Sequence, residues 1–258
     1  MPGFYDRYLG AIAFAPYAAE MALRVAVFSP SNVLETAAGT GLVTEGLVKT
    51  LGPKARIVAT DLSQPMLDFA AAKDLGPQVE FRLADAQALP FDDASFDVAV
   101  CQFGVMFLPD KHRAFCEARR VLTAQGRFVF TVWDTLEENE MARISVEALA
   151  TLFPDNPPMF NRRVPYGYND VVAVEAALRA AGFADVAVEI VSKRMHAATA
   201  RDYAIGTCQG GSNRTDIEAR DPNAVERATD VVAQAIERQL GSGPISARSQ
   251  AIIFIASG

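Results

Sequence analysis

The chain has 258 residues, of which half are hydrophobic and 21% are charged, as in an ordinary soluble globular protein with room for one large α/β domain. Its net charge of −7 and the lack of a basic stripe argue against a nucleic-acid partner, because phosphate binding requires clustered lysine and arginine. Cys101, Cys116 and Cys208 are too few and too scattered for a disulfide framework or a metal site, which favours a reducing, cytoplasmic compartment.

The N-terminal segment is apolar over residues 9–28, which raises the question of a signal peptide or a membrane span. Pro16, Glu20 and Arg24 interrupt this run, and no small-residue cleavage site follows a basic start. We therefore expect one or two amphipathic helices packed on the domain and no membrane span. The dense aromatic residues from Phe4 to Tyr17 suit burial in a core as well as they suit contact with a ligand.

Residues 32–41 read Asn-Val-Leu-Glu-Thr-Ala-Ala-Gly-Thr-Gly and predict a short apolar strand that runs through a glycine turn into a helix. Such a turn is typical of nucleotide sites, because glycine lets the backbone approach a ligand and the helix start offers unpaired N–H groups. A dinucleotide site needs a third glycine where Thr44 stands, and a phosphate-binding P-loop needs a lysine after the turn. Glu35 would instead repel a pyrophosphate and attract a cationic ligand.

A second strand is predicted at residues 55–60, and Asp61 ends it, 20 residues after Gly41. An acidic residue at this distance is placed to accept hydrogen bonds from both hydroxyls of a ribose. Asp61 could also cap the helix that begins at residues 63–67, a role that Ser63 can take as well.

Further strands are predicted at residues 79–84, 97–102 and 126–133, with a helix at 109–122 and a solvated turn at 92–97. After Trp133 we expect helices at 137–153, 170–180, 201–210 and 221–240 and strands at 186–191 and 250–256. The segment 192–248 between the last two strands is long and is predicted to contribute to a substrate-side cap.

The run from Val33 to Trp133 resembles the class I S-adenosylmethionine-dependent methyltransferases, in particular the broad group similar to quinone-biosynthesis methyltransferases. The resemblance rests on Glu35-x-Ala37-x-Gly39-x-Gly41 and on three phrases: Asp-Leu-Ser-Gln-Pro-Met-Leu, Leu-Pro-Phe-Asp-Asp-Ala-Ser-Phe-Asp-Val and Val-Leu-Thr-Ala-Gln-Gly-Arg-Phe. Ala37 replaces the first glycine of the family motif, and as a small residue it should cost little.

The resemblance implies a Rossmann-like α/β sheet of seven strands in the order 3-2-1-4-5-7-6, with strand 7 antiparallel and a helical substrate cap. One methyltransferase domain would span residues 1–258, with an N-terminal helical cap at 1–31, a cofactor-binding core at 32–133 and substrate-side elements and edge strands at 134–258. The implied cofactor is S-adenosyl-L-methionine, with S-adenosyl-L-homocysteine as the product. No metal is implied.

The positions that the resemblance assigns to cofactor binding lie on the N-terminal helix, in the glycine turn and after the next three strands. They are Tyr8, Glu35, Ala37, Gly39, Thr40, Gly41, Asp61, Leu62, Met66, Asp85, Ala86, Gln102, Phe103 and Phe107. Aromatic rings at Tyr5, Tyr8, Phe103 and Phe107 could stabilise the sulfonium through cation–π contact. Tyr17 is an alternative to Tyr8 on the N-terminal helix.

The expected activity is in-line transfer of a methyl group to a small hydrophobic molecule, which requires no universal catalytic residue. His196 is the one histidine to test as a general base, although an ordinary loop position explains it better. Two alternatives remain: a non-catalytic S-adenosylmethionine-binding protein and an NAD-dependent oxidoreductase. The acceptor, the methylated atom and the oligomeric state are open, and a homodimer is compatible with the sequence.

Overall fold

The computed structural model describes residues 2–258, apart from the side chain of Ser212. The chain divides into two compact units. Unit 1 contains the residues up to Pro16, Trp133–Tyr168 and Val191–Ala251, and unit 2 contains Tyr17–Val132, Asn169–Ile190 and Ile252–Gly258. The division of the chain into one domain with three segments stays a prediction.

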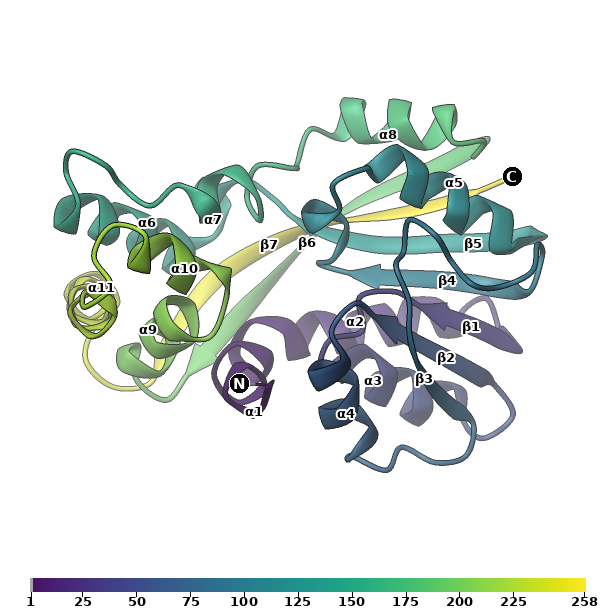
Figure 1. Ribbon diagram of the computed structural model, residues 1–258, viewed down its shortest axis with the longest axis horizontal. Helices are drawn as coiled ribbons and strands as arrows, with labels where there is room; N and C mark the ends of the chain where they lie inside the picture. Colours follow the sequence, from purple (N-terminus) through teal and green to yellow (C-terminus); the bar gives the residue numbers. More distant parts are fainter. Residues whose placement is uncertain (1) are drawn as a thin grey trace. The chain divides into compact units, whose positions relative to one another are not determined.

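Seven strands form one sheet in the order β3-β2-β1-β4-β5-β7-β6 (Figure 1). The four pairs among the first five strands of this order are parallel, and β7 is antiparallel, so the predicted fold class and strand order are confirmed. The strands are β1 Asn32–Glu35, β2 Arg56–Asp61, β3 Val79–Leu83, β4 Phe96–Gln102, β5 Leu122–Trp133, β6 Asp185–Ala197 and β7 Ile245–Ser257.

The central strands are apolar because helices cover both of their faces. Val33 and Leu34 of β1 pair with Ile57 and Val58 of β2, and all four side chains are fully buried. Parallel pairing brings the carboxyl ends of β1, β2, β3, β4 and β5 to one edge of the sheet, where ligands bind in folds of this class.

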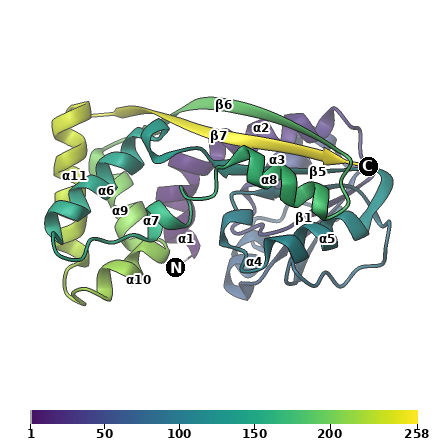
Figure 2. The same ribbon diagram turned by 90° about the horizontal axis from the view of Figure 1, so that it is seen from above.

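The helices of unit 2 are α3 Leu42–Leu51, α4 Gln64–Ala71, α5 Lys111–Val121, α8 Val171–Ala180, the 3₁₀ turn Val105–Phe107 and most of α2 Ala15–Ala26. Helices α2 and α3 pack together on one face of the sheet, with Gly46 close to Ala18 and Ala22, and α5 and α8 pack together on the other (Figure 2). Asp110 caps α5 and Asp170 caps α8, each through its side chain.

Unit 1 contains short helices and turns together with three longer helices, α6 Glu140–Leu152, α9 Ala200–Gln209 and α11 Val225–Leu240, which pack on one another through α11. The shorter elements are α1 Pro2–Tyr5, the π-helix Asp6–Phe14, the 3₁₀ turn Leu136–Glu138, α7 Phe160–Arg163 and α10 Ser212–Glu218. Helix α11 contacts α6 and α9 through buried side chains that include Val232 and Ile236. Trp133 stacks on Tyr166, with their ring centroids 5.9 Å apart.

Residues Pro2–Ala26 form a helical run that is long and apolar enough, by length and composition, to cross a membrane. Buried helices of soluble proteins pass the same test, and Tyr17, Met21 and Val25 are buried in unit 2. The expectation that this segment is no membrane span therefore stays a prediction.

Several predicted boundaries are wrong in the C-terminal half. Strands β6 and β7 are 13 residues each, about twice the predicted length, so His196 lies within β6 and not in a loop after it. The intervening segment shrinks to residues 198–244, and its last helix begins at Val225 because residues 221–224 form a turn. Ser63 makes no side-chain cap bond, and its backbone N–H donates to the carboxylate of Asp61.

Candidate S-adenosylmethionine site

The turn after β1 alternates between ordinary and left-handed backbone. Ala37, Gly39 and Gly41 have φ of +54°, +57° and +80°. The Ala38 N–H donates to the Thr60 carbonyl on β2, and the Gly41 N–H donates to the Ala38 carbonyl, which closes the turn. A Cβ built on Gly39 meets no heavy atom within 4 Å, so this part of the backbone faces open space and is accessible to a ligand.

Asp61 ends β2 and its carboxylate is fixed by the backbone on both sides. The Gly39 N–H donates to Oδ2 and the Ser63 N–H donates to Oδ1, both at 2.8 Å. An ionised carboxylate has about four acceptor positions, so each oxygen keeps one. Asp61 therefore ties the glycine turn to β2 and still presents two acceptors side by side, the arrangement that a vicinal diol requires.

Glu35 is buried at the base of the turn, 2% exposed. Its Oε2 accepts a hydrogen bond from the Thr44 hydroxyl at 2.7 Å. Burial raises the pKa of Glu35 to about 8, while the bond from Thr44 lowers it and the charge of Asp61 raises it. Glu35 therefore holds its proton at neutral pH. A nearby positive charge or a higher pH favours the carboxylate form, which would attract a cation.

Thr44 has a structural reason to stand where a dinucleotide site has its third glycine. It is fully buried at the start of α3, and its hydroxyl satisfies the Glu35 carboxyl. Glycine there would leave a buried acid without this partner, so the pair Glu35–Thr44 belongs to a site with a different ligand.

Asp85 and Ala86 follow β3 at the same edge of the sheet. The Asp85 carboxylate accepts from the backbone N–H of Gln87 at 2.8 Å and from the Gln87 side chain at 3.1 Å, which shapes the loop in which it lies. The predicted contact with an adenine amine would add a bond to this carboxylate and remains a prediction.

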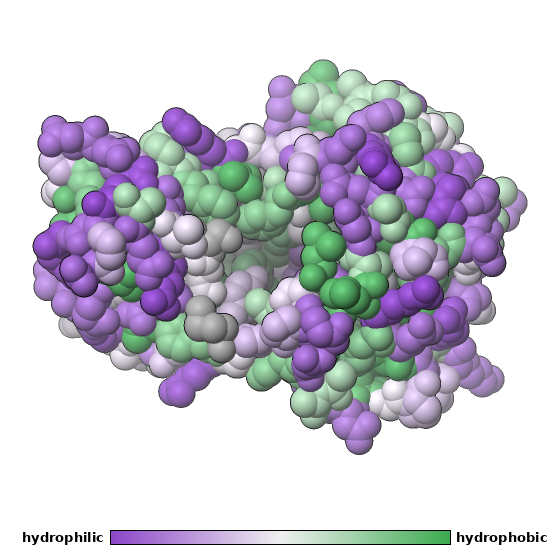
Figure 3. All heavy atoms as spheres, viewed as in Figure 1, coloured by the Kyte–Doolittle hydropathy of each residue, from purple (hydrophilic) through white to green (hydrophobic). Residues whose placement is uncertain are grey.

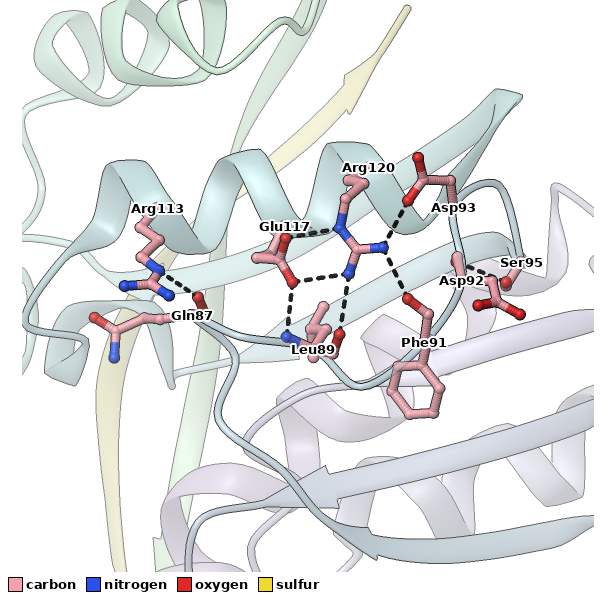
Figure 4. Close-up of polar contacts among 9 residues, drawn as sticks. All are labelled: Gln87, Leu89, Phe91, Asp92, Asp93, Ser95, Arg113, Glu117 and Arg120. Carbon is pink, nitrogen blue, oxygen red and sulfur yellow. Dashed lines mark hydrogen bonds and ion pairs between the residues drawn. The ribbon is translucent and has the colours of Figure 1, made fainter.

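The loop that begins with Asp85 is clamped by helix α5 (Figure 4). Arg120 donates five hydrogen bonds: two to the carboxylate of Glu117, two to the carbonyls of Leu89 and Phe91, and one to the carboxylate of Asp93. Because a guanidinium has five N–H groups, none is left over. The bonds from Arg120 also hold the pKa of Glu117 below its ordinary value, so the pair stays ionised.

Two further contacts complete this clamp, which we call the α5 clamp (Glu117, Arg120 and Arg113). Glu117 accepts the backbone N–H of Leu89 at 2.7 Å, and Arg113 donates to the carbonyl of Gln87 at 2.8 Å. Helix α5 therefore positions residues 87–91, and it also bonds Asp93 in the turn predicted at 92–97, whose residues 92–94 are exposed as expected. Sequence reasoning missed these residues, and the only signal was two arginines and a glutamate on the polar side of α5 that faces the loop.

The end of β4 is strained and tightly packed. Phe103 has φ of +52°, which is rare for a bulky residue. Its ring and that of Tyr17 are T-shaped to each other, with their centroids 5.3 Å apart. Gly104 follows; a Cβ there would lie 2.6 Å from the Cβ of Ala37 and 2.7 Å from the Sγ of Cys101. The glycine at 104 therefore permits a side chain at Ala37.

Three exposed apolar side chains lie along the carboxyl edge. Leu62, Leu83 and Phe107 are 64%, 52% and 48% exposed, and each lies at or just after the end of a parallel strand. The space-filling view shows apolar patches between polar side chains on one face of the molecule (Figure 3). Apolar groups that are exposed beside polar acceptors are typical of a binding site.

The structure thus brings together most of the predicted cofactor positions in unit 2. Those from Glu35 to Phe107 lie in or just after β1, β2, β3 and β4, with Thr40 buried and Met66 half-buried on α4. Tyr8 and Tyr5 lie in unit 1, where Tyr8 packs on Phe4 with a ring separation of 4.8 Å. His196 is an exposed residue of β6 in unit 1.

These residues fit an adenosyl sulfonium compound better than a dinucleotide. The turn offers open backbone at Gly39, Asp61 offers paired acceptors for a diol, and Glu35 offers an acid that a positive charge would ionise. A pyrophosphate would instead face the carboxylate of Asp61 beside the turn. The donor set therefore suits a ligand with a ribose at one end and a cation at the other.

Comparisons with known proteins agree. Residues 34–130 match the model of a methyltransferase domain. A demethylmenaquinone methyltransferase of Lactobacillus johnsonii is 32% identical over 126 residues, which are 47% of this chain and 51% of that protein. The ubiquinone/menaquinone biosynthesis C-methyltransferase UbiE of Hahella chejuensis is 37% identical over 103 residues, 38% of this chain and 41% of that protein. The chain thus spans about half the length of these relatives or less.

Solved structures share the fold. The YcgJ protein of Bacillus subtilis superposes with a TM-score of 0.57 at 16% sequence identity, over 93% of this chain and 97% of that one. Phosphoethanolamine N-methyltransferase 2 of Haemonchus contortus, solved with S-adenosyl-L-methionine, gives a TM-score of 0.62 at 16% identity, over 99% of this chain and 56% of that one. The predicted resemblance is confirmed over this part of the chain: residues 34–130 match a methyltransferase domain, and the chain is similar there to the quinone-biosynthesis methyltransferases.

Proposed function

We propose that the protein transfers a methyl group in line from S-adenosylmethionine to a small, hydrophobic acceptor. The observation that carries the proposal is Asp61, whose carboxylate is held by the N–H groups of Gly39 and Ser63 with one acceptor position left on each oxygen. Asp61 would hold the ribose, Asp85 and Ala86 the adenine, and Gln102, Phe103 and Phe107 the methionine end.

When bound, S-adenosylmethionine supplies an electrophilic methyl group on a sulfonium, so the difficult electronics come with the ligand. The chain's own residues position the ligand and shield it from water. The α5 clamp fixes the loop that carries Asp85, and the exposed ring of Phe107 supplies an apolar wall. Glu35 can ionise when a cation lies nearby, and its carboxylate then still accepts the hydrogen bond from Thr44. Exclusion of water by apolar groups strengthens each of these electrostatic contacts.

A general base is required only if the acceptor must lose a proton during the attack. His196 is a hypothesis for this role, and Tyr8, Tyr5 and Tyr17 are hypotheses for contact with the ligand. Replacement of His196 by glutamine should leave cofactor binding unchanged, and a fall in turnover with an unchanged KM for S-adenosylmethionine would support the hypothesis.

The acceptor is the least constrained part of the proposal. The relatives named above act on demethylmenaquinone or in ubiquinone and menaquinone synthesis, which makes an apolar hydroquinone the first acceptor to try. We further propose a cytoplasmic enzyme that uses neither nucleic acid nor a metal as a partner, with a homodimer as an open alternative to the monomer.

The test is a calorimetric titration with S-adenosylmethionine and S-adenosylhomocysteine, followed by a screen for methyl transfer from labelled cofactor to small hydroquinones. Asp61→Ala should weaken binding by about 100-fold, because it removes two charge-assisted hydrogen bonds and loosens the glycine turn. Asp155→Ala, an exposed carboxylate of unit 1, is the matched control and should bind like the wild type.

Wild-type protein that binds neither compound would refute the proposal. Binding without any transfer across the screen would favour the non-catalytic binding protein. Binding of NADH in place of both compounds would revive the oxidoreductase, which Thr44 and the acidic residues of the turn argue against.

A further inference from the structure

Thr131 places an unpaired hydroxyl inside the apolar strand β5. The residue is 1% exposed, and its Oγ1 has no hydrogen-bond partner among the described residues. Val129, two positions earlier on the same side of the strand, is fully buried and apolar. Valine has the shape of threonine without the hydroxyl, and an unpaired buried hydroxyl destabilises a fold. The fold alone would therefore favour valine at 131, and the hydroxyl requires another explanation.

The side of the sheet on which Thr131 lies follows from its neighbours. Phe128 and Phe130 contact Phe115 of α5, so their side chains point to the α5 face. Arg127 lies over the ring of Phe28, just after α2, so the odd-numbered residues of this strand point to the α2 face. Thr131 therefore points to the α2 face.

Gln102 is the register partner of Thr131 on the adjacent strand β4. Cys101 contributes to the small cavity beside Phe115 on the α5 face, so Gln102 points to the α2 face, as Thr131 does. Neighbouring strands are about 5 Å apart, so the two side chains project from adjacent positions on this face. Both groups are neutral, and each can donate and accept, which suits a neutral oxygen atom better than a phosphate or an ammonium group.

The position of Thr131 separates it from the residues proposed to hold the ribose and the adenine. Gly39 and Asp85 follow β1 and β3, and Asp61 ends β2, all on one side of the switch point between β1 and β4. Thr131 and Gln102 lie at the ends of β5 and β4, on the other side. If the adenosine covers the ends of β1, β2 and β3 and the methionine end reaches Gln102, the end of β5 is left for the acceptor, and Gln102 lies between the two ligands.

We propose that the Thr131 hydroxyl, together with the amide of Gln102, binds a hydroxyl or carbonyl oxygen of the methyl acceptor. The proposal rests on the proposed function, since it assumes an acceptor beside the cofactor. Oγ1 is covered in this structure, so a side chain moves when the acceptor binds. Gln102 is long and rotatable, and the strained Phe103 next to it donates its N–H to the Thr131 carbonyl, which couples the two strand ends.

Stability gives the first test. Thr131→Val removes an unpaired hydroxyl and should raise the midpoint of thermal unfolding by about 2 to 4 °C. Thr60→Val is the matched contrast, because the buried hydroxyl of Thr60 donates to the Glu35 carbonyl at 3.0 Å, and its loss should lower the midpoint. Thr131→Ser keeps the hydroxyl and serves as the conservative variant.

Binding gives the second test, with naphthol and naphthalene as probes that differ by one oxygen. Both are titrated into the wild type and the variants, with and without saturating S-adenosylhomocysteine. Wild type and Thr131→Ser should bind naphthol about fivefold more tightly than naphthalene, and Thr131→Val should lose this preference while it binds naphthalene like the wild type. A variant that is more stable and yet binds less well distinguishes a binding role from a structural one.

An undiminished preference for naphthol in Thr131→Val would overturn the proposal, as would a wild type that binds both probes equally. The proposed function fails separately, through the titration with S-adenosylhomocysteine itself. A wild type that discriminates between the probes but does not bind S-adenosylhomocysteine would keep the oxygen-binding pair and refute the methyltransferase assignment.

Discussion

The glycine turn at residues 36–41 and the loop at residues 85–95 lead to the same edge of the sheet, and they are held in different ways. The turn is fixed by its own neighbours in β1, β2 and α3. The N–H of Ala38 donates to the Thr60 carbonyl, the N–H of Gly39 donates to the Asp61 carboxylate, and the Thr44 hydroxyl donates to Glu35. The loop carries few such bonds of its own and is held by side chains of α5, which begins 26 residues after Asp85.

This difference has a physical basis. The turn binds through its backbone, so its conformation must be built into local residues, including strained ones such as Ala37. The loop has no helix or strand of its own, so its carbonyl groups need donors from elsewhere, and Arg120 supplies them. The turn should therefore respond to local substitutions and to pH, and the loop to changes on α5.

The largest expected effect is the pH response of the turn. The folded pKa of Glu35, about 8, lies above its unfolded value of 4.5. Between these values the unfolded chain releases the proton and the folded chain retains it, so the free energy of unfolding falls as the pH rises from about 4.5 to about 8. The loss from this one group is on the order of 5 kcal/mol. Above pH 8 both states are ionised and the contribution is constant.

Glu35→Gln should remove this part of the pH dependence, because glutamine still accepts a hydrogen bond from Thr44 and does not ionise. Urea unfolding of wild type and variant at pH 5, 7 and 9 measures it, with Glu80→Gln on the exposed side of β3 as the control. Parallel pH curves for wild type and Glu35→Gln would show that the buried acid does not govern the stability of the turn.

Substitution of the α5 clamp should have the next largest effect. Arg120→Lys replaces a guanidinium with five donors by an ammonium that cannot reach Glu117, Asp93 and two carbonyls at once. We expect a loss of about 2 kcal/mol in the free energy of unfolding, given that the side chain is partly exposed, and a weaker affinity for S-adenosylhomocysteine. Arg119→Lys, one position earlier, is the control.

Hydrogen exchange separates the two loops in this variant. Amides of residues 87–95 should exchange faster in Arg120→Lys, while those of residues 36–41 should keep their protection. Equal acceleration in both segments would mean that the loops are not held independently and would remove the basis of the comparison.

Sequence alone was sufficient for the parts of the site in which one local pattern has one structural solution. A strand, an acidic residue and alternating glycines predicted the turn, and Asp61 at the end of the next strand lies where the spacing places it. Strand order followed from the resemblance, and it is confirmed. The wrong predictions about Ser63 and His196 concern a cap and a strand end, which depend on partners outside the local pattern.

Local sequence patterns do not predict contacts between residues that are far apart in the chain. Nothing local marks Arg120 as a partner of Leu89 and Phe91, since an arginine on the polar side of a helix is usually solvated. The state of Glu35 was also misjudged, because burial and the hydroxyl of Thr44 are consequences of packing. Strand lengths in β6 and β7 were underestimated, since apolar alternation fades where polar residues face solvent.

The smallest expected effect concerns Ala37, whose replacement of a family glycine was expected to cost little. At φ of +54° an alanine is strained, and Ala37→Gly should raise the free energy of unfolding by about 1 kcal/mol. Ala38→Gly is the matched control in the same turn. Ala38 is buried and is not among the residues with positive φ, so its replacement should destabilise the chain by about the same amount.

Gly104 supplies the second half of this test. Gly104→Ala places a Cβ against both Ala37 and Cys101 and should destabilise the chain by about 1 to 3 kcal/mol. Combined with Ala37→Gly it should cost less than the sum of the single effects, because one of the two clashes is gone while that with Cys101 remains. Strict additivity in this double-mutant cycle would show that Ala37 and Gly104 do not touch, and the turn would then owe its shape to β1 and β2 alone.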